Sequence, residues 1–327
     1  MRRYITTGQG NPRLKLVEVP DSQPKRGEVA IDLKAMSLNY RDLLMVHVPD
    51  VLPGSDGAGI ISAVGADVTV FKPGDRVVIG FITGWTEGEF SVAKQATSLG
   101  GPGMDGVLAE RIIVPANSVV RIPDKMTFEE AATLPCAGVT AWSALFEHRH
   151  IQPGETVLLL GTGGVSIFAL QLAKKAGARV IITSSSDDKL ERARALGADE
   201  TINYKQNSDW EEEVLKLTGG LGADLAVDAV GPATLNKTLK AVRAGGHISL
   251  MGILTGFEGA IDTGVILGKR ITLQGIFVGP VSTLNSLISS DIKPVIEEIF
   301  PFEAVEKAYD ALQAAGHVGK IVVKISD

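Results

Sequence analysis

The sequence predicts an α/β protein that combines a partly open β-barrel with a doubly wound parallel sheet. Three observations lead to this prediction. Short β-rich runs separated by glycine and proline occupy residues 1–123. After Gly154, apolar runs alternate with helix-length amphipathic stretches, as strands covered on both faces do. The chain, at 327 residues, is long enough to bury two cores.

In the first segment, four runs of β-forming residues are bounded by turn residues. A helix is expected to follow them, because Thr127 and Glu130 have the spacing at which each side chain caps the other's backbone amide. The predicted strands lie at 28–35, 59–64, 75–79 and 107–115.

The second segment begins with the apolar run TVLLLG, at residues 156–161. A helix over 164–176, the run ARVIITS, the charged helix DDKLERARAL and the run ETINY follow in order. LAVDAVG and HISLMG continue this alternation, and the chain closes on the β run after HVGK. The pattern is typical of a parallel sheet built from strand–helix–strand units.

Composition excludes several classes of protein. With 38 acidic and 32 basic side chains, the net charge of −6 provides no basic stripe for nucleic acid or an anionic membrane. No signal peptide and no apolar run of about 18 residues is recognised, so we expect no membrane span. Cys136 is the single cysteine, which excludes an internal disulfide and a four-thiolate zinc lobe. A cytoplasmic location is expected.

A glycine-rich turn, LLLGTGGVS, joins the first predicted strand of the second segment to its helix. Gly161, Gly163 and Gly164 would let a pyrophosphate approach the helix N-terminus, where unpaired amides and the helix dipole favour negative charge. Ser166 replaces the third glycine of the usual pattern. The strand–turn–helix–strand setting favours dinucleotide binding over simple turn chemistry.

The end of the second strand indicates which nicotinamide cofactor is preferred. An NAD site commonly has Asp or Glu there, whereas this chain has Ser184 and Ser185, with Lys189 shortly after. Hydroxyl donors and a cation suit a 2′-phosphate, so NADP is favoured and NAD remains possible. The alternative is a serine-rich loop whose lysine belongs to a solvated helix face.

Seven segments in order resemble the medium-chain dehydrogenase/reductase superfamily: SLNYRDLLM, PGSDGAGIISAVG, FKPGDRVV, LPCAGVTAW, LGTGGVS, the turn after ARVIITSSS, and HVGKIVVKI. The resemblance implies a GroES-like catalytic domain from residues 1–136 plus 278–327, and a Rossmann domain over 137–277 inserted in it. It also implies an active site between the domains. A homodimer or homotetramer is expected, with 271–277 as a candidate edge strand.

Zinc enzymes of this superfamily hold the catalytic metal with Cys, His and Cys, and the matching positions here are Asn39, Ser55 and Cys136. An amide and a hydroxyl do not replace a thiolate and an imidazole. The chain is therefore identified as a zinc-independent member, similar to the quinone oxidoreductase and enoyl reductase branches. We expect no metal site, and Cys136 as a small apolar residue.

The resemblance places Asn39, Tyr40 and Thr140 at the nicotinamide end of the site. Asn39 and Tyr40 would polarise a carbonyl oxygen, and a phenol can also donate a proton. Packing remains the alternative for Tyr40, and a bond to its own helix backbone for Thr140. Asp56 is expected to pair with Arg41 or another cation rather than act as a base.

The remaining cofactor contacts also follow from the resemblance. Tyr204 would lie near the adenosine, the Gly252 backbone near the nicotinamide ribose, and Lys320 near the phosphates. A strand-end aromatic and a solvated lysine are the alternatives for Tyr204 and Lys320. The diphosphate turn itself comprises Gly161, Thr162, Gly163, Gly164 and Val165.

The predicted function is an NADP(H)-dependent reductase that transfers hydride to an activated double bond or a quinone of a small-molecule substrate. A metal-free alcohol dehydrogenase or carbonyl reductase, and a non-catalytic dinucleotide-binding redox sensor, are the alternatives. Two loops at the expected substrate rim, 46–53 and 281–294, look shorter than in relatives, so the sequence leaves the substrate open.

Overall fold

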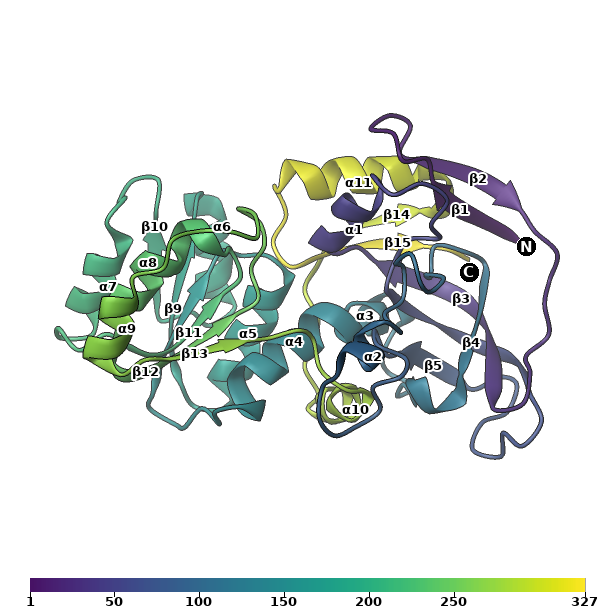
Figure 1. The fold of residues 1–327 in the computed structure, drawn as a ribbon, viewed down its shortest axis with the longest axis horizontal. Coiled ribbons are helices and arrows are strands. Elements are labelled where there is room, and N and C mark those ends of the chain that lie inside the picture. The colour runs from purple at the N-terminus through teal and green to yellow at the C-terminus, as the bar shows by residue number, and fades with distance from the viewer. Residues whose placement is uncertain (327) are drawn as a thin grey trace. The chain divides into compact units, whose positions relative to one another are not determined.

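The computed structural model describes residues 1–326 and divides the chain into two compact units (Figure 1). The first, here called the barrel unit, comprises Met1–Val139 and the chain from Val278 onward. The second, the sheet unit, comprises Thr140–Phe277. Each unit has a hydrophobic core of its own.

The sheet unit confirms the predicted parallel sheet. Its six strands run in the order β10-β9-β8-β11-β12-β13, and every neighbouring pair is parallel. Successive strands are added toward one edge of the sheet from β8 to β10 and toward the other edge from β11 to β13. Ligands of such sheets bind at the carboxyl ends of the strands where this order changes, here β8 and β11. The strands are β8 (Thr156–Leu160), β9 (Arg179–Ser184), β10 (Glu200–Asn203), β11 (Ala223–Asp228), β12 (Val242–Leu250) and β13 (Thr272–Gly275).

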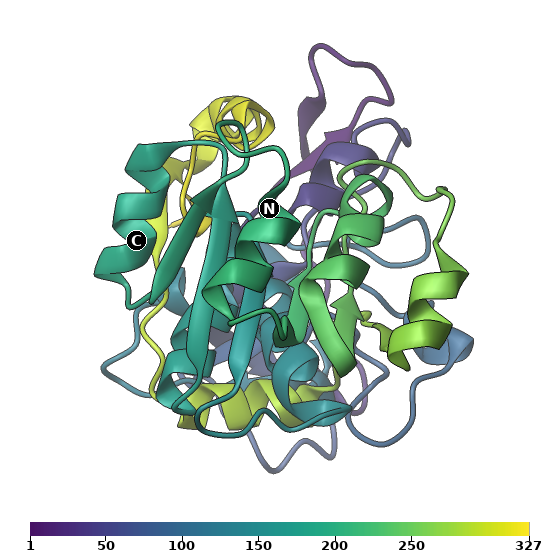
Figure 2. The ribbon, with the colours of Figure 1, turned by 90° about the vertical axis from the view of Figure 1, so that its left-hand side faces the viewer.

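Helices lie on both sides of these strands, which explains why the strands are apolar without alternation (Figure 2). Val157, Leu158 and Leu159 of β8, for example, are completely buried. The helices are α4 (Val139–Trp142), which crosses the boundary between the units, α5 (Gly164–Lys175), α6 (Asp187–Ala195), α7 (Trp210–Leu217), α8 (Pro232–Ala241) and α9 (Thr263–Lys269).

The barrel unit contains a seven-stranded sheet in the order β14-β15-β3-β4-β5-β7, with β6 also paired to β3, and a separate β1-β2 hairpin. This arrangement confirms the predicted GroES-like barrel. The strands are β1 (Arg2–Thr6), β2 (Leu14–Glu18), β3 (Glu28–Ser37), β4 (Asp56–Val64), β5 (Arg76–Ile79), β6 (Arg111–Pro115), β7 (Val119–Arg121), β14 (Ile296–Pro301) and β15 (Lys320–Lys324).

The predicted strand at 107–115 is too long, because β6 begins only at Arg111. Val107 and Leu108 are fully buried, but their amides donate to the Gly54 and Pro53 carbonyls, outside the sheet. Buried apolar residues in a loop produce the same sequence pattern as a strand, so periodicity does not distinguish them.

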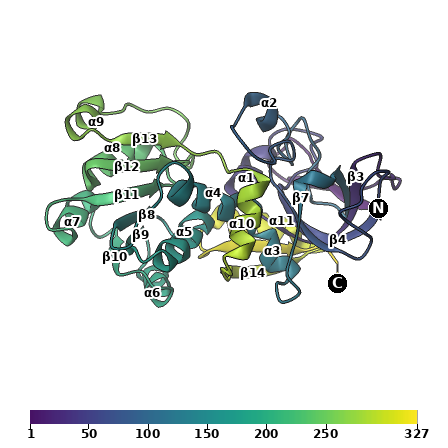
Figure 3. The same cartoon turned by 90° about the horizontal axis from the view of Figure 1, so that it is seen from below.

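The predicted cap at Thr127 is confirmed. Thr127 Oγ1 accepts from the Glu130 amide at 3.1 Å, and the Glu130 carboxylate accepts from the Thr127 amide at 2.9 Å. A π-helical turn, Leu134–Gly138, follows this helix and contacts it, β4 and α10 (Figure 3). The helices of the unit are α1 (Tyr40–Met45), α2 (Val92–Gln95), α3 (Phe128–Ala132), α10 (Val281–Ser289) and α11 (Val305–Ala314).

Within residues 1–326, no helix combines the length and apolar character needed to cross a membrane.

Candidate active site

Strand pairing in the barrel unit brings together two residues that lie far apart in the sequence. β15 pairs antiparallel with the end of β3, so that Val322 is opposite Ser37, and the Leu38 amide donates to the Ile321 carbonyl at 3.0 Å. Lys320, the first residue of β15, therefore lies beside Asn39. Its ammonium donates to the Leu38 carbonyl at 2.6 Å and to Asn39 Oδ1 at 2.5 Å.

A set of polar side chains surrounds this contact. Asn39 Nδ2 lies 3.5 Å from Ser55 Oγ, and the Ser55 hydroxyl donates to Asp56 Oδ1 at 2.8 Å. The Cys136 amide donates to Asp56 Oδ2 at 3.1 Å, because the π-helical turn packs on β4. We call Asn39, Ser55, Asp56, Cys136 and Lys320 the polar cluster.

Burial decides the electrostatics of the polar cluster. Ser55 and Asp56 are inaccessible to solvent, and Lys320 is only 3% exposed. Burial raises the pKa of Asp56, while the Lys320 ammonium and the hydrogen bond with Asn39 oppose the rise. Burial and the neighbouring Asp56 raise the pKa of the Cys136 thiol to about 12, so the thiol stays protonated at neutral pH.

Asp42 lies in the first turn of α1, the helix that follows Asn39. Its Oδ2 accepts from the Asn39 amide at 2.8 Å, which fixes the start of α1. The carboxyl is completely buried, and burial raises its pKa to about 6, although Arg41 and the Asn39 amide oppose the rise. Nothing in the sequence pattern around Asp42 indicates that this carboxyl is buried.

The residues at the zinc-ligand positions do not fit a catalytic zinc. Asn39 and Ser55 provide an amide and a hydroxyl, whereas zinc sites of this kind need about three thiolate, imidazole or carboxylate ligands. The Asn39 oxygen is already bound to an ammonium, and that positive charge would repel a second cation. Within residues 1–326, no three His, Cys, Asp or Glu side chains are grouped as a metal site.

Asp56 was expected to pair with Arg41 or another cation, and the cation that interacts electrostatically with it is the Lys320 ammonium. Arg41 is bonded elsewhere. Its guanidinium donates to the Leu99 and Gly100 carbonyls at 2.9 and 3.3 Å and lies over the Phe81 ring. Asp56 is instead hydrogen-bonded by its neighbours in the polar cluster.

The other predicted residues near the nicotinamide occupy different environments. Tyr40 is the first residue of α1 and is 38% exposed, so its ring is accessible beside Asn39. Thr140 is buried in α4 at the edge of the sheet unit.

In the sheet unit, the glycine-rich turn is open where a diphosphate would lie. Gly161 has a φ of +79°, which favours glycine, and a Cβ at Gly161 or Gly163 would have no atom within 4 Å. Gly163 is the N-cap of α5 and provides no side-chain cap, so the first amides of the helix, from Gly164 and Val165, are left for a ligand. The turn therefore fits a dinucleotide.

Ser166 shows how the third glycine can be replaced. Its side chain is buried, and its hydroxyl donates to the carbonyl of Leu160, the last residue of β8, at 2.8 Å. The serine thus links β8 to α5 and leaves the diphosphate position clear.

The end of β9 lies beside the glycine-rich turn, as predicted for a cofactor site. Thr162 Oγ1 is 3.4 Å from Ser184 Oγ, and the Gly161 amide donates to Thr183 Oγ1 at 3.4 Å. Ser184 is buried, whereas Ser185 is partly exposed, so Ser185 has the more accessible hydroxyl. Lys189 lies in the first turns of α6.

Tyr204 follows β10 and belongs to the same edge of the sheet. Its amide donates to the Ser184 carbonyl at 3.0 Å, and its side chain is 42% exposed. Asp187 lies at the start of α6, and its carboxylate accepts from the Asn203 and Gln206 amides, both at 2.7 Å. Those bonds lower the pKa of Asp187.

Gly252 follows β12 where the backbone passes very close to the turn after β11. A Cβ there would lie 2.2 Å from the Val230 nitrogen. Asp228, which the sequence analysis did not single out, holds that turn: its Oδ1 accepts from the Val230 and Gly231 amides, and its Oδ2 from Thr238. Glycine at 252 is therefore required by packing alone.

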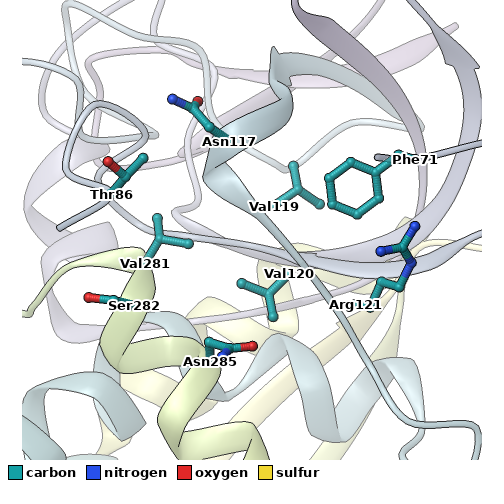
Figure 4. Close-up of a pocket in the computed structure, with 9 residues that line it drawn as sticks. All are labelled: Phe71, Thr86, Asn117, Val119, Val120, Arg121, Val281, Ser282 and Asn285. Atoms are coloured by element: carbon teal, nitrogen blue, oxygen red, sulfur yellow. The ribbon is translucent and has the colours of Figure 1, made fainter. Parts of the chain in front are cut away.

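A surface groove of about 410 Å³ in the barrel unit is lined by none of the predicted site residues (Figure 4). Its only charged side chain, Arg121, is already bound to Asp75 and the Val70 carbonyl and lies over Phe71. The groove is lined by Phe71, Thr86, Asn117, Val119, Val120, Arg121, Val281, Ser282 and Asn285.

An open diphosphate turn on a doubly wound sheet, combined with a barrel unit that carries a buried polar cluster, defines an oxidoreductase of the NAD(P)-dependent dehydrogenase class. Residues 25–124 match the family described as "Alcohol dehydrogenase GroES-like domain", and residues 164–300 match that described as "Zinc-binding dehydrogenase". The chain belongs to the medium-chain dehydrogenase/reductase superfamily, in its alcohol dehydrogenase-like branch.

Three proteins illustrate the relationship. A "zinc-type alcohol dehydrogenase-like protein" of Schizosaccharomyces pombe is 44% identical over 319 residues, which cover 91% of each chain. A solved structure from Sinorhizobium meliloti 1021, named for alcohol dehydrogenase, is 40% identical with a TM-score of 0.92 and covers 99% of this chain and 98% of its own. A quinone oxidoreductase of Pseudomonas syringae pv. Tomato DC3000 is 28% identical, with a TM-score of 0.83 and coverage of 99% and 100%.

Proposed function

We propose that the protein is a zinc-independent, NADP(H)-dependent reductase of activated double bonds or quinones. One observation carries the proposal: the positions that would hold zinc are occupied by an amide and a hydroxyl, and a lysine ammonium is bonded to that amide. Such a site polarises an acceptor oxygen by hydrogen bonds and charge instead of by a metal.

A bound dihydronicotinamide supplies the hydride, and the protein stabilises the charge that the acceptor gains. In an enone, hydride addition at the β-carbon moves the π electrons toward the carbonyl oxygen, and a proton at the α-carbon completes the reduction. Asn39 Nδ2 is the proposed donor to that oxygen. The exposed Tyr40 hydroxyl is proposed as a second donor and as the source of the proton.

In the sheet unit, the open turn at Gly161, Thr162, Gly163, Gly164 and Val165 is proposed to hold the diphosphate. The accessible Ser185 hydroxyl and Lys189 are proposed to favour a 2′-phosphate, with Ser184 supporting them through Thr162. Tyr204 is proposed to lie near the adenosine, and Gly252 near the nicotinamide ribose.

The cofactor preference is tested at Ser185. Ser185→Asp adds a negative charge at the strand end, and we expect the Kd for NADPH to rise about tenfold or more while that for NADH changes less than about threefold. Ser185→Ala is the matched control, since it removes the hydroxyl without adding charge. An equal loss of both cofactors in Ser185→Asp would show that this strand end does not read the 2′-phosphate.

A metal-free alcohol dehydrogenase or carbonyl reductase is the second candidate. The name of the 44% identical relative favours alcohol dehydrogenase chemistry, although that name also reads "zinc-type". The polar cluster would serve this reaction also, because a ketone oxygen needs the same donors. The two candidates differ in the atom that receives the hydride.

The zinc-independent reductase is tested by following NADPH oxidation with an enone and with a quinone, before and after exhaustive chelation. We expect turnover to be unchanged by the chelator, in protein that contains well below one zinc per chain by elemental analysis. Loss of turnover that added zinc restores would contradict the proposal.

The proposed assembly is a homodimer or homotetramer. β13 is one of the two edge strands of the six-stranded sheet, the other being β10, and an unpaired edge favours pairing with a second copy. Phe257 and Leu267, both 77% exposed, precede this strand.

A further inference from the structure

Lys320 is a buried cation that donates two hydrogen bonds to neutral oxygens. Lysine is almost never this buried without partners, because removing an ammonium from water is costly. The balancing negative charge comes from Asp42 and Asp56, whose electrostatic interactions with Lys320 favour their ionised forms. The resemblance implied a contact between Lys320 and the cofactor phosphates, yet the ammonium is directed at Leu38 and Asn39.

The bond from Lys320 fixes which way the Asn39 amide faces. Because an ammonium only donates, the atom 2.5 Å from it must be the amide oxygen, and Nδ2 must face the other way, toward Ser55. Nδ2 carries two hydrogens, and its neighbours are Ser55 Oγ at 3.5 Å and the Asp56 carboxylate. The Ser55 contact is at the outer limit of a hydrogen bond, so an acceptor oxygen that enters the site can take its place, and Asn39 is still 9% exposed.

The same bond also changes the strength of that donor. A cation on the amide oxygen draws electron density from the nitrogen, and hydrogen bonds in such chains strengthen one another in a buried setting. The positive charge of Lys320 also stabilises the negative charge that develops on an acceptor oxygen bound at Nδ2.

We infer that Lys320 is a positioning residue for hydride transfer: it holds and polarises the Asn39 amide so that Nδ2–H donates to the carbonyl oxygen of a conjugated ketone or quinone. This inference rests on the proposed function. It replaces the expected phosphate contact of Lys320 with a role at the acceptor.

The first test compares Lys320→Met, which keeps the length of the side chain without its charge, with Lys320→Arg, which keeps the cation. We expect kcat for enone reduction to fall about tenfold to hundredfold in Lys320→Met. This loss is smaller than the loss of kcat caused by removing an oxyanion donor itself, because Asn39 is still present. KM for NADPH should stay within about twofold, and Lys320→Arg should recover much of kcat. Lys324→Met, on the same strand, is the control for removing a lysine from β15.

Two results of that comparison would overturn the inference. A rise in KM for NADPH with unchanged kcat would show that Lys320 serves the phosphates. Equal losses in the Met and Arg variants, with kcat and stability falling together, would show that the side chain only supports folding.

A double-mutant cycle tests whether Lys320 acts through Asn39. In an Asn39→Ala background, Lys320→Met should change kcat by less than about twofold, because the amide that the ammonium positions is gone. Full additivity of the two losses would contradict the inference.

A readout without turnover separates this inference from the proposed function. The Asn39 side-chain amide resonances, assigned in ¹⁵N-labelled protein by their loss in Asn39→Ala, should shift in Lys320→Met and their hydrogens should exchange faster with water. If the wild type reduces neither enone nor quinone, the proposed function fails while this measurement still decides the contact. Unmoved amide resonances would overturn the contact itself.

Discussion

The buried Asp42 carboxyl makes the stability of the barrel unit depend on pH in a direction opposite to that of most acidic residues. Its pKa is raised from 3.8 to about 6, so the folded protein binds the proton more tightly than the unfolded chain between these values. Stability is therefore greatest below the unfolded pKa and falls as pH rises through about 6. At about 1.36 kcal/mol per pKa unit, the full effect is about 3 kcal/mol.

Asp42→Asn removes this titration and keeps a side-chain oxygen that can accept from the Asn39 amide. We expect the free energy of unfolding of the variant, minus that of the wild type, to rise by roughly 2 to 3 kcal/mol between pH 4 and pH 8. Urea unfolding followed by Trp85 fluorescence in a Trp142→Phe, Trp210→Phe background measures it. Trp85 is then the single tryptophan and lies in the same unit as Asp42.

Asp75→Asn is the control of opposite sign. Burial opposes the shift, but hydrogen bonds from the Lys72 amide and Arg121 lower the pKa of Asp75. Its contribution to stability is present above the unfolded pKa and is lost as pH falls, so the difference between this variant and the wild type should slope the other way. A flat pH dependence for Asp42→Asn would refute the assignment of a buried, protonatable carboxyl.

Further predictions concern two glycines and one tyrosine. Gly163→Ala should leave the free energy of unfolding within about 1 kcal/mol but weaken NADPH binding about tenfold, because its Cβ enters open space above the turn; unchanged affinity by titration would count against a diphosphate there. Gly252→Ala should instead destabilise the protein by about 2 kcal/mol or more, since its Cβ would meet backbone at 2.2 Å, and a wild-type urea midpoint would contradict this. Tyr40→Phe should lower kcat about tenfold with folding intact, and unchanged turnover would leave Tyr40 a packing role.

Local patterns in the sequence were sufficient to predict the sheet unit. The apolar run before Gly161, the uncapped helix start at Gly163 and the second strand each depend on residues close together in the chain, so periodicity and turn chemistry identify them. The capping pair of Thr127 and Glu130 is local in the same way, and the structure confirms it. The edges of elements were less predictable, as the late start of β6 shows.

The polar cluster could not be assembled from the sequence, because its contacts are set by strand pairing. Lys320 and Asn39 are 281 residues apart and meet only since β15 pairs with β3. Asp56 was expected to pair with Arg41 or another cation. That cation is Lys320, from the far end of the chain, and the π-helical turn adds the Cys136 amide. Burial of Asp42 is likewise invisible in the sequence, where YRDLLM resembles an ordinary helix start.

Product analysis tests the central claim most directly. The protein is incubated with NADPH, a chelator and a 2-enone, which offers both a C=C and a C=O bond to the hydride. A metal-free site that polarises the carbonyl oxygen through Asn39 and Tyr40 predicts the saturated ketone as product. An allylic alcohol would contradict double-bond reduction and assign the chain to carbonyl chemistry, and turnover that stops with the chelator and returns with zinc would contradict the metal-free site.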